Sequence, residues 1–336
     1  MSKFSLNVLE KHVFPFVETN DPDVILGASF GEDVALTRVG GDILASHVDP
    51  IIGAIDNIGW LAVHVACNDV AASGVPPRWI LLLLLVPKQT DVELLEQIMH
   101  DVKRAAGEIG VSIIGGHTGY SSGLSRPLVA VSALGTASDH RIVRTNGACV
   151  GDHVIVTKGV ALEGTAILAT DFPDVATSKG LNNQDLNDAR NLMKETSVVS
   201  EALALAKIGV SAMHDVTRGG LLETLLEIAH LSDVSIEVDA SRLLNRPIVT
   251  RFAEAFKFDP MKMISSGSLA VTVPADRMEE VNRTLMNMKI PFADIGSVKQ
   301  GNGVHLISGD RIIHYSEIRC EEDELARMWA LYPRDK

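Results

Sequence analysis

Four aspartates stand beside glycines at positions where strands and helices are expected to end. They are Asp33 in Gly31-Glu32-Asp33, Asp49 in Ser46-His47-Val48-Asp49-Pro50, Asp69 in Cys67-Asn68-Asp69, and Asp215 in His214-Asp215-Val216-Thr217-Arg218-Gly219-Gly220. Hard divalent cations such as Mg²⁺ take oxygen ligands, usually a few carboxylates together with substrate phosphates and water. Carboxylates from separate strand and helix ends suit that demand. For each aspartate taken alone, the alternative is a helix cap or a turn.

Asp69 belongs to a segment, 58–75, that is helical in length and almost wholly apolar, which predicts a buried helix. The strongly polar side chains of this segment are those of His64, Asn68, Asp69 and Ser73. Burying an unpaired carboxylate costs several kcal/mol. Asp69 is therefore expected to have a cation or hydrogen-bond donors close by, and it is a candidate both for metal binding and for catalysis.

Two glycine clusters are candidates for phosphate binding. Gly115-Gly116-His117-Thr118-Gly119 directly follows the expected strand 111–114, and Gly219-Gly220 opens an expected helix. Free backbone N–H groups at such places, together with the helix dipole, favour phosphate oxygens. Thr118 adds a hydroxyl, and Lys158, at an expected strand end, adds a cation within reach of a phosphate. Neither cluster matches the GxxxxGK[ST] or GxGxxG pattern, and a plain turn is the alternative.

The elements that must position these residues alternate between strands and helices in both halves. Strands are expected at 33–39, 43–48, 79–86, 111–114, 128–137, 153–159, 234–238 and 269–273, and helices at 58–75, 94–106, 163–170, 219–231, 276–288 and 323–331. The Asn-rich stretch 181–191 is either a long loop or the start of a helix. The continuously apolar run 79–86 is typical of a strand covered on both faces. This alternation predicts two α/β domains, and the Asn-Gly and Gly-Asp turns at 147–152 place the boundary between 1–148 and 149–336.

Composition narrows the class of protein. With 336 residues and 46% hydrophobic residues, the chain has enough apolar material for two packed cores. A formal net charge of −13 would repel nucleic acid. The longest apolar run, 79–87, is too short for a bilayer, which needs about 20 helical residues. The three cysteines form no CxxC pair. We therefore expect a soluble cytoplasmic protein without nucleic-acid or membrane partners.

Taken in order, six segments resemble the aminoimidazole-ribonucleotide-synthetase (AIR synthase, PurM)-related ATP enzymes. The segments are FGEDVAL (30–36), SHVDPIIGAIDNIGWLAVHVACNDVAASGVPPRWI (46–80), IIGGHTGY (113–120), RPLVAVSALG (126–135), GDHVIVTKG (151–159) and HDVTRGGLLETLLEIA (214–229). The resemblance runs from about residue 25 to residue 310. It implies a PurM-like two-domain α/β (α+β) fold, in which the N-terminal domain forms a β-barrel across a homodimer and the C-terminal domain is an α/β sandwich.

The resemblance also implies a site. ATP would lie in a cleft between the domains, close to the subunit interface, with Mg²⁺ on Asp33, Asp49, Asp69 and Asp215. The residues it assigns to the nucleotide and its phosphates are Gly31, Asn68, Gly115, Gly116, Thr118, Gly219 and Gly220. His117 departs from the kinase-like members, which place Asp there. A histidine ring does not replace a carboxylate on Mg²⁺, so His117 is assigned to phosphate contact or proton transfer, beside Asp69 and Lys158 as candidate catalytic residues.

Within this family, HDVTRGG is similar to the HDPTRGG segment of the hydrogenase-maturation protein HypE. HypE uses ATP to dehydrate a carboxamide carried on its own C-terminal cysteine, in a tail that ends Pro-Arg-Ile-Cys. Here Cys320 is followed by 16 further residues with an expected helix, and the proline is missing. A half-buried cysteine near a helix start is therefore favoured over a carrier thiol. His47 and His64 are each interpreted first as structural histidines, with substrate contact as the alternative.

Three functions follow from these observations. The first is an ATP- and Mg²⁺-dependent enzyme that activates a substrate oxygen by phosphoryl transfer, HypE-like carbamoyl dehydration with a maturation partner being one form of it. The second is a small-molecule kinase or ligase of the same fold, similar to thiamin-monophosphate kinase. The third is a partner protein that binds ATP without turnover. Selenophosphate synthesis is disfavoured because the first 30 residues contain no cysteine.

Overall fold

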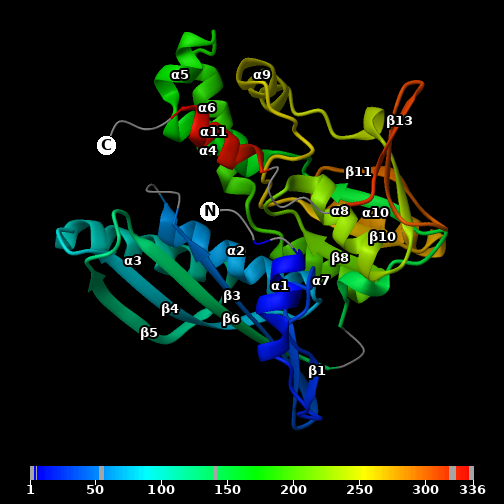
Figure 1. Ribbon diagram of the computed structural model, residues 1–336, viewed down its shortest axis with the longest axis horizontal. Helices are drawn as coiled ribbons and strands as arrows, with labels where there is room; N and C mark the ends of the chain where they lie inside the picture. The colour runs from blue at the N-terminus through cyan, green and yellow to red at the C-terminus, as the bar shows by residue number, and fades with distance from the viewer. Residues whose placement is uncertain (1–3, 5, 53–56, 139–141, 318–322, 333–336) are drawn as a thin grey trace.

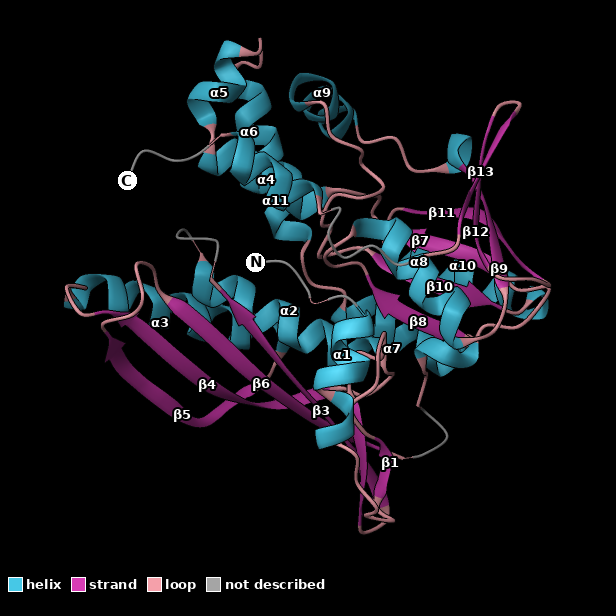
Figure 2. Ribbon diagram, viewed as in Figure 1, coloured by secondary structure: helices cyan, strands magenta, loops and turns pink. Residues whose placement is uncertain are grey.

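Two mixed β-sheets, one from each half of the chain, lie on either side of a central helix (Figures 1 and 2). The computed structural model describes residues 4, 6–52, 57–138, 142–317 and 323–332. The central helix, α2 (Ile58–Ala72), contacts strands of the N-terminal sheet and elements of the C-terminal half. This is the two-domain α/β arrangement that the sequence predicts.

The N-terminal sheet has six strands in the order β1-β2-β3-β6-β4-β5. Their bounds are β1 Val24–Leu26, β2 Ala35–Val39, β3 Asp42–Ile51, β4 Pro77–Pro87, β5 Ser112–Ser121 and β6 Leu128–Ala137. Neighbouring strands are antiparallel except β4 and β5, which are parallel and joined by the crossover helix α3 (Val92–Ile109). The strands at 33–39, 43–48, 79–86 and 128–137 are confirmed with small changes in their bounds.

Helices α2 and α3 cover one face of this sheet, as the apolar spacing predicts. Every residue of α2 is buried. In α3 the buried side chains are Ile98, Val102, Ala105 and Ala106, and the remaining positions face outward or are half-buried. Gly110 ends α3 in the left-handed conformation, with φ of 72°.

The opposite face of the sheet is open, which corrects the expectation that 79–86 is covered on both sides. Side chains of β4 alternate, so that Ile80, Leu82 and Leu84 are buried while Leu81 and Leu83 are 40% and 36% exposed. Val48 on β3 points to the same side, because it pairs with Ser132 of β6, which pairs with Leu81. We call Leu81, Leu83 and Val48 the open apolar face.

The segment Gly115-Gly116-His117-Thr118-Gly119 is also different from the prediction. It is not a loop after a short strand; it continues β5, paired with β4 through a register shift at Ile80 and Leu81. A Cβ atom on Gly116 would stand 1.9 Å from the Leu82 carbonyl oxygen. Glycine is needed there because the backbone of β4 approaches so closely.

The C-terminal sheet has seven strands in the order β13-β12-β9-β11-β7-β10-β8. Their bounds are β7 His153–Thr157, β8 Ala212–Asp215, β9 Ser235–Asp239, β10 Leu269–Val273, β11 Phe292–Lys299, β12 Gly303–Ser308 and β13 Arg311–Tyr315. Only the β9–β12 pair is parallel among the described strand pairs of this sheet. The helices that accompany it are α7 Val199–Ile208, α8 Gly220–Leu231 and α10 Met278–Asn287. The strands predicted at 153–159, 234–238 and 269–273 are confirmed.

A separate group of helices stands above the two sheets in Figure 1. It comprises α4 Leu162–Asp171, α5 Pro173–Ser178, α6 Asn183–Asn191, α9 Pro247–Phe256 and α11 Glu324–Leu331, and it has an apolar core of its own. The Asn-rich stretch is helical because Asn182 and Asp185 form a reciprocal capping box at the start of α6.

The two halves share one core. Residues of α2 cluster with Leu205 of α7, Met213 of β8 and Val271 of β10. The N-terminal segment, with α1 (Leu6–His12) and the short helix η1 (Phe14–Phe16), lies against the end of α8 at His230 and Leu231. A division at 148/149 stays a prediction. None of the helices in the described ranges combines the length and hydropathy that a membrane span requires.

Candidate metal and nucleotide site

A cavity of about 440 Å³ lies where the two halves meet, and acidic side chains from both halves line it. The acidic residues are Glu32, Asp33, Asp49, Asp69, Glu163 and Glu227. They are contributed by a loop, a strand and three helices that are far apart in the sequence. The sequence prediction that Asp33, Asp49 and Asp69 share one site agrees with their positions around this cavity.

The local structure explains why each of these aspartates faces the cavity. Asp33 lies in the loop between β1 and β2, two residues after Gly31, whose φ is 72°. Asp49 is two residues from His47 on β3, so both side chains are on the same face of the strand. Asp69 is near the end of α2 and is 6% exposed.

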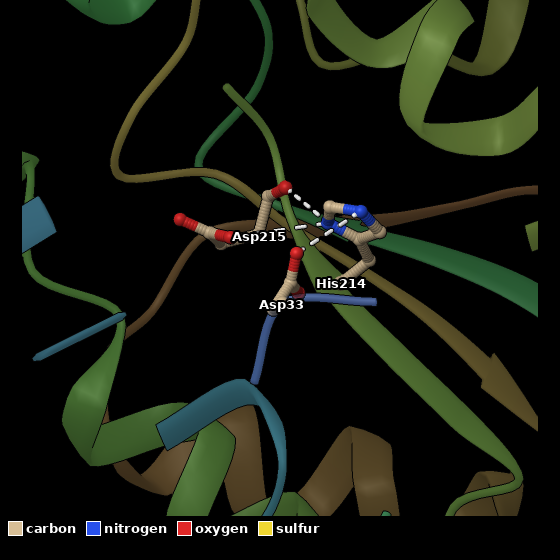
Figure 3. Close-up of side chains that lie close together, drawn as sticks. All are labelled: Asp33, His214 and Asp215. Carbon is tan, nitrogen blue, oxygen red and sulfur yellow. Dashed lines mark hydrogen bonds and ion pairs between the residues drawn. The ribbon is translucent and has the colours of Figure 1, made fainter. Parts of the chain in front are cut away.

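Asp215 stands directly behind this group of carboxylates, at the end of β8. Ligand atoms of Asp33, His214 and Asp215 all lie within 4.8 Å of one another (Figure 3). His214 Nε2 is 3.2 Å from Asp33 Oδ1 and 3.1 Å from Glu227 Oε2, and its Nδ1 is 2.7 Å from the Asp215 carbonyl oxygen. The ring of His214 therefore joins β8, α8 and the loop that carries Asp33.

Electrostatics favour the protonated form of His214. Burial by itself lowers the pKa of this imidazole, but the nearby carboxylates of Asp33 and Glu227 outweigh it and raise the pKa to about 10. The imidazolium then donates from both nitrogens and offsets part of the negative charge collected around it.

His47 has the opposite character. Its Nε2 lies 3.4 Å from Asp69 Oδ2, while burial lowers the pKa of the ring to about 4. The ring is therefore neutral near pH 7, and it contacts Asp69 as a hydrogen-bond partner rather than as a cation.

The C-terminal half adds a further acid and a permanent cation to the cavity lining. Glu163, in the first turn of α4, accepts a hydrogen bond from Ser266 N at 3.3 Å, and burial raises the pKa of its carboxyl group. Arg218 lines the cavity and lies 3.9 Å from Asp323 at the start of α11. Thr217 and Ser266 add hydroxyl groups.

The donor set fits a hard divalent cation. Asp33, Asp49 and Asp69 offer carboxylate oxygens to one cavity, and Asp215 is close behind Asp33. Oxygen ligands of this kind, with room left for phosphates and water, are those that Mg²⁺ prefers.

Asn68 and Lys158 are placed differently from the prediction. Asn68 is fully buried, with Nδ2 donating to Thr196 O at 2.8 Å and Oδ1 accepting from Val198 N at 2.9 Å. The Lys158 ammonium donates to the carbonyl oxygens of residues 195 and 197, and lies 2.6 Å from Glu201 Oε1. Neither residue lines the cavity. Their contacts hold the segment before α7 in place, so the geometry supports a structural role for both.

The glycines that the resemblance assigns to the nucleotide do not all lie at the cavity. Gly31 lines the cavity, whereas Gly219 lines a neighbouring hollow beside Lys262 and Tyr315. Gly220 is buried, and a Cβ atom there would stand 2.5 Å from the Met261 carbonyl oxygen. The residues Gly115, Gly116, His117 and Thr118 are exposed on the edge strand β5 and do not line the cavity. Within one chain, the glycine strand and the aspartates therefore lie at two separate sites.

Sequence reasoning missed several residues of the site. His214 and Glu227 lie in the segment HDVTRGGLLETLLEIA, but the match of this segment did not single them out. No motif in the sequence marked Glu163. His64 is structural, as expected, with Nε2 3.1 Å from Glu108 Oε2. Cys320 lies outside the described residues.

Comparison with known proteins identifies the family. The profile of the AIR synthase related protein N-terminal domain matches residues 31–137, and that of the C-terminal domain matches 150–309. The chain belongs to the AIR synthase-related superfamily. This superfamily is one of ATP-dependent enzymes, as the sequence predicted.

Among its relatives, the carbamoyl dehydratase HypE of Rhodobacter capsulatus is 30% identical over 232 residues, which cover 68% of this chain and 65% of HypE. The chain thus spans slightly less than two thirds of that relative. Other relatives include a putative hydrogenase expression/formation protein of Methanocaldococcus jannaschii, selenide, water dikinases and thiamine-monophosphate kinases.

Solved structures of this superfamily share the fold. A HypE in complex with ATP matches with a TM-score of 0.70 and 23% identity, covering 82% of this chain and 86% of that one. A HypE–HypF complex matches with a TM-score of 0.72 and 21% identity, covering 85% and 93%. These values establish a PurM-like two-domain fold.

Proposed function

We propose that this AIR synthase-related enzyme binds ATP with Mg²⁺ in the acidic cavity and transfers the γ-phosphoryl group to an oxygen of an acceptor. The observation that carries the proposal is the convergence of Asp33, Asp49 and Asp69 on one cavity from a loop, a strand and a helix. A structural role alone does not require three carboxylates, from elements far apart in sequence, to face one open space.

Each part of the cavity has a role in this proposal. Asp33, Asp49 and Asp69, backed by Asp215, would hold Mg²⁺, which when bound supplies positive charge against the phosphate oxygens. Arg218 supplies a permanent cation to the same cavity, and the hydroxyls of Thr217 and Ser266 are donors for phosphate oxygens.

The proposed transfer exchanges one phosphorus–oxygen bond for another. The acceptor oxygen forms a bond to the γ-phosphorus while the bond from that phosphorus to the β–γ bridging oxygen breaks, so that ADP leaves. A hydroxyl acceptor loses its proton to solvent. An amide oxygen that receives the phosphoryl group gains a good leaving group, which is the activation that dehydration requires.

The test compares two aspartates on the same strand. Asp49→Asn should abolish the thermal stabilisation produced by the magnesium complex of the non-hydrolysable analogue AMPPNP, whereas Asp42→Asn, at the exposed start of β3, should keep it. Asp69→Asn should behave like Asp49→Asn. Equal stabilisation of all three variants would refute the proposed site.

The open apolar face supports the homodimer that the resemblance implies. Contiguous exposed apolar surface on a sheet marks an interaction site. The glycine strand, Gly115–Thr118, lies on β5, the edge strand of the same sheet. In a dimer formed through this sheet, residues of the second copy would lie close to it. We place the proposed phosphate roles of Gly115, Gly116, His117 and Thr118 in that dimer, because one chain alone keeps them away from the cavity.

The form of the reaction distinguishes the remaining candidates. In a HypE-like reaction the carboxamide would be carried on Cys320 and a maturation partner would be needed; one solved HypE structure is a complex with HypF. A kinase-like reaction would use a diffusible acceptor. A nucleotide-binding partner protein would show AMPPNP-dependent stabilisation but no ADP formation with any acceptor tested.

A further inference from the structure

The cavity has an apolar side, built by the two ends of the chain. Phe14 of η1 and Phe4 approach from the N-terminal segment, and Leu325 and Trp329 from α11. Ile167 of α4 completes this side. We call these five residues the aromatic wall, because three of them are aromatic.

The C-terminal part of the wall is firmly attached. Asp323 caps α11 by accepting from Leu325 N and Ala326 N, and it lies 3.9 Å from Arg218. Glu324 accepts from Asp259 N at 3.1 Å. Leu325 and Met328 are buried in the core of the helical group.

The end of α11 is attached as well. Arg327 donates to the Lys257 carbonyl oxygen at 2.6 Å, and the ring of Tyr332 lies 5.7 Å from that of Phe256 and 6.0 Å from that of Phe172. The helix that follows Cys320 is therefore a built part of the cavity and not a free arm.

The aromatic wall and the carboxylates of Asp33, Asp49 and Asp69 line one continuous cavity. A ligand held against Trp329 and Phe14 would thus share the space with the phosphates held by the aspartates. Indole and phenyl rings contribute large contact areas and prefer other planar rings at stacking or edge-on geometry. The five wall residues are all uncharged, so the wall itself offers no cation to an anionic ligand.

We infer that the aromatic wall binds the acceptor, and that the acceptor is a free, uncharged small molecule with a planar aromatic ring and an oxygen-bearing substituent such as a carboxamide or a hydroxyl. This inference rests on the proposed function and names its acceptor class. The acceptor ring stacks on Trp329 and Phe14, and its substituent points toward the carboxylates of Asp33, Asp49 and Asp69. The acceptor is not a group carried on Cys320.

The experiment uses benzamide as the probe, with butyramide as the matched amide without a ring. Saturation-transfer difference NMR on the full chain with magnesium and AMPPNP should detect benzamide and not butyramide. Trp329→Ala should weaken benzamide binding about tenfold, since both burial and ring stacking are lost. Leu331→Ala, at an exposed position of the same helix, should leave it unchanged.

A second pair of variants keeps the test independent of α11 folding. Phe14→Ala should also weaken benzamide binding, whereas Phe16→Ala, 83% exposed on the same short helix, should not. Cys320→Ser should bind benzamide like the unmodified chain. Unchanged binding in both Trp329→Ala and Phe14→Ala, equal signals for benzamide and butyramide, or no benzamide signal from a chain that AMPPNP stabilises, would overturn the inference.

Nucleotide binding separates this failure from failure of the proposed function. If magnesium and AMPPNP stabilise the Trp329→Ala variant as they do the unmodified chain, the metal site of the variant is intact. A change in its benzamide binding then concerns the aromatic wall alone. If AMPPNP gives no stabilisation of the unmodified chain, it is the proposed function that fails.

Discussion

The two described cysteines differ sharply in reactivity. Cys67 is fully buried in α2, where burial, with the nearby Asp69 carboxylate, raises the pKa of its thiol to about 12. Cys149 is exposed. In the folded protein at pH 8, iodoacetamide should therefore label Cys149 and leave Cys67 unlabelled, as measured by peptide mass spectrometry. Labelling of both in urea is the control, and early labelling of Cys67 without denaturant would contradict the buried position of α2.

Lys158 gives a second prediction at the scale of single residues. Its ammonium is the partner of Glu201, which is 1% exposed. Lys158→Met should lower the free energy of unfolding by about 3–5 kcal/mol because it leaves the buried Glu201 carboxylate without its cation. The double variant Lys158→Met with Glu201→Leu should recover much of this loss in urea unfolding. A Lys158→Met variant of unchanged stability that fails to bind AMPPNP would restore the phosphate role predicted from the sequence.

Among the elements, β5 shows how a glycine pair can be misinterpreted. Gly116→Ala should disrupt the pairing of β4 and β5, because the added methyl group would collide with the Leu82 carbonyl, and should cost more than about 2 kcal/mol of stability. Gly107→Ala, in α3 with open space around it, should instead add about 0.5–1 kcal/mol. Thermal unfolding of both variants gives the comparison. Equal effects would show that Gly116 is not constrained by β4.

Most elements could be predicted because their own residues carry the pattern. The apolar stripe of α3 and the wholly apolar α2 depend on nothing beyond their spacing. The continuation of β5 through Gly115–Gly119 could not be predicted, since it depends on the approach of β4, which is a tertiary contact. Likewise, an apolar run such as 79–86 does not say whether its second face is covered by the same chain or by another.

The site was predictable only in part, for a related reason. Asp33 stands near Gly31, Asp49 stands before a proline at an expected strand end, and Asp69 stands in an apolar helix, where a carboxylate is conspicuous. Asn68 and Lys158 have the same neighbours in sequence, but their side chains turn to the backbone at residues 195–198, a contact invisible along the chain. Glu163 and Trp329 reach the cavity from helices whose packing decides their direction.

At the scale of the whole molecule, the open apolar face predicts self-association. Replacing both Leu81 and Leu83 by Glu should convert a dimer to a monomer, because charges on a buried interface are costly to desolvate. Val92→Glu, 57% exposed at the start of α3, is the control and should leave the mass unchanged. Sedimentation velocity at micromolar concentration distinguishes the two. A monomeric unmodified chain would contradict the prediction.

The position of α2 has one more consequence, for how the molecule responds to ligands. Because this helix is buried on all sides by residues of both halves, neither half can loosen without exposing it, and the aspartate it carries is lost with it. Unfolding should therefore proceed as a single cooperative transition, with no stage at which one half has melted and the other persists. Binding of an ion near the end of α2 would therefore stabilise both halves of the fold against unfolding.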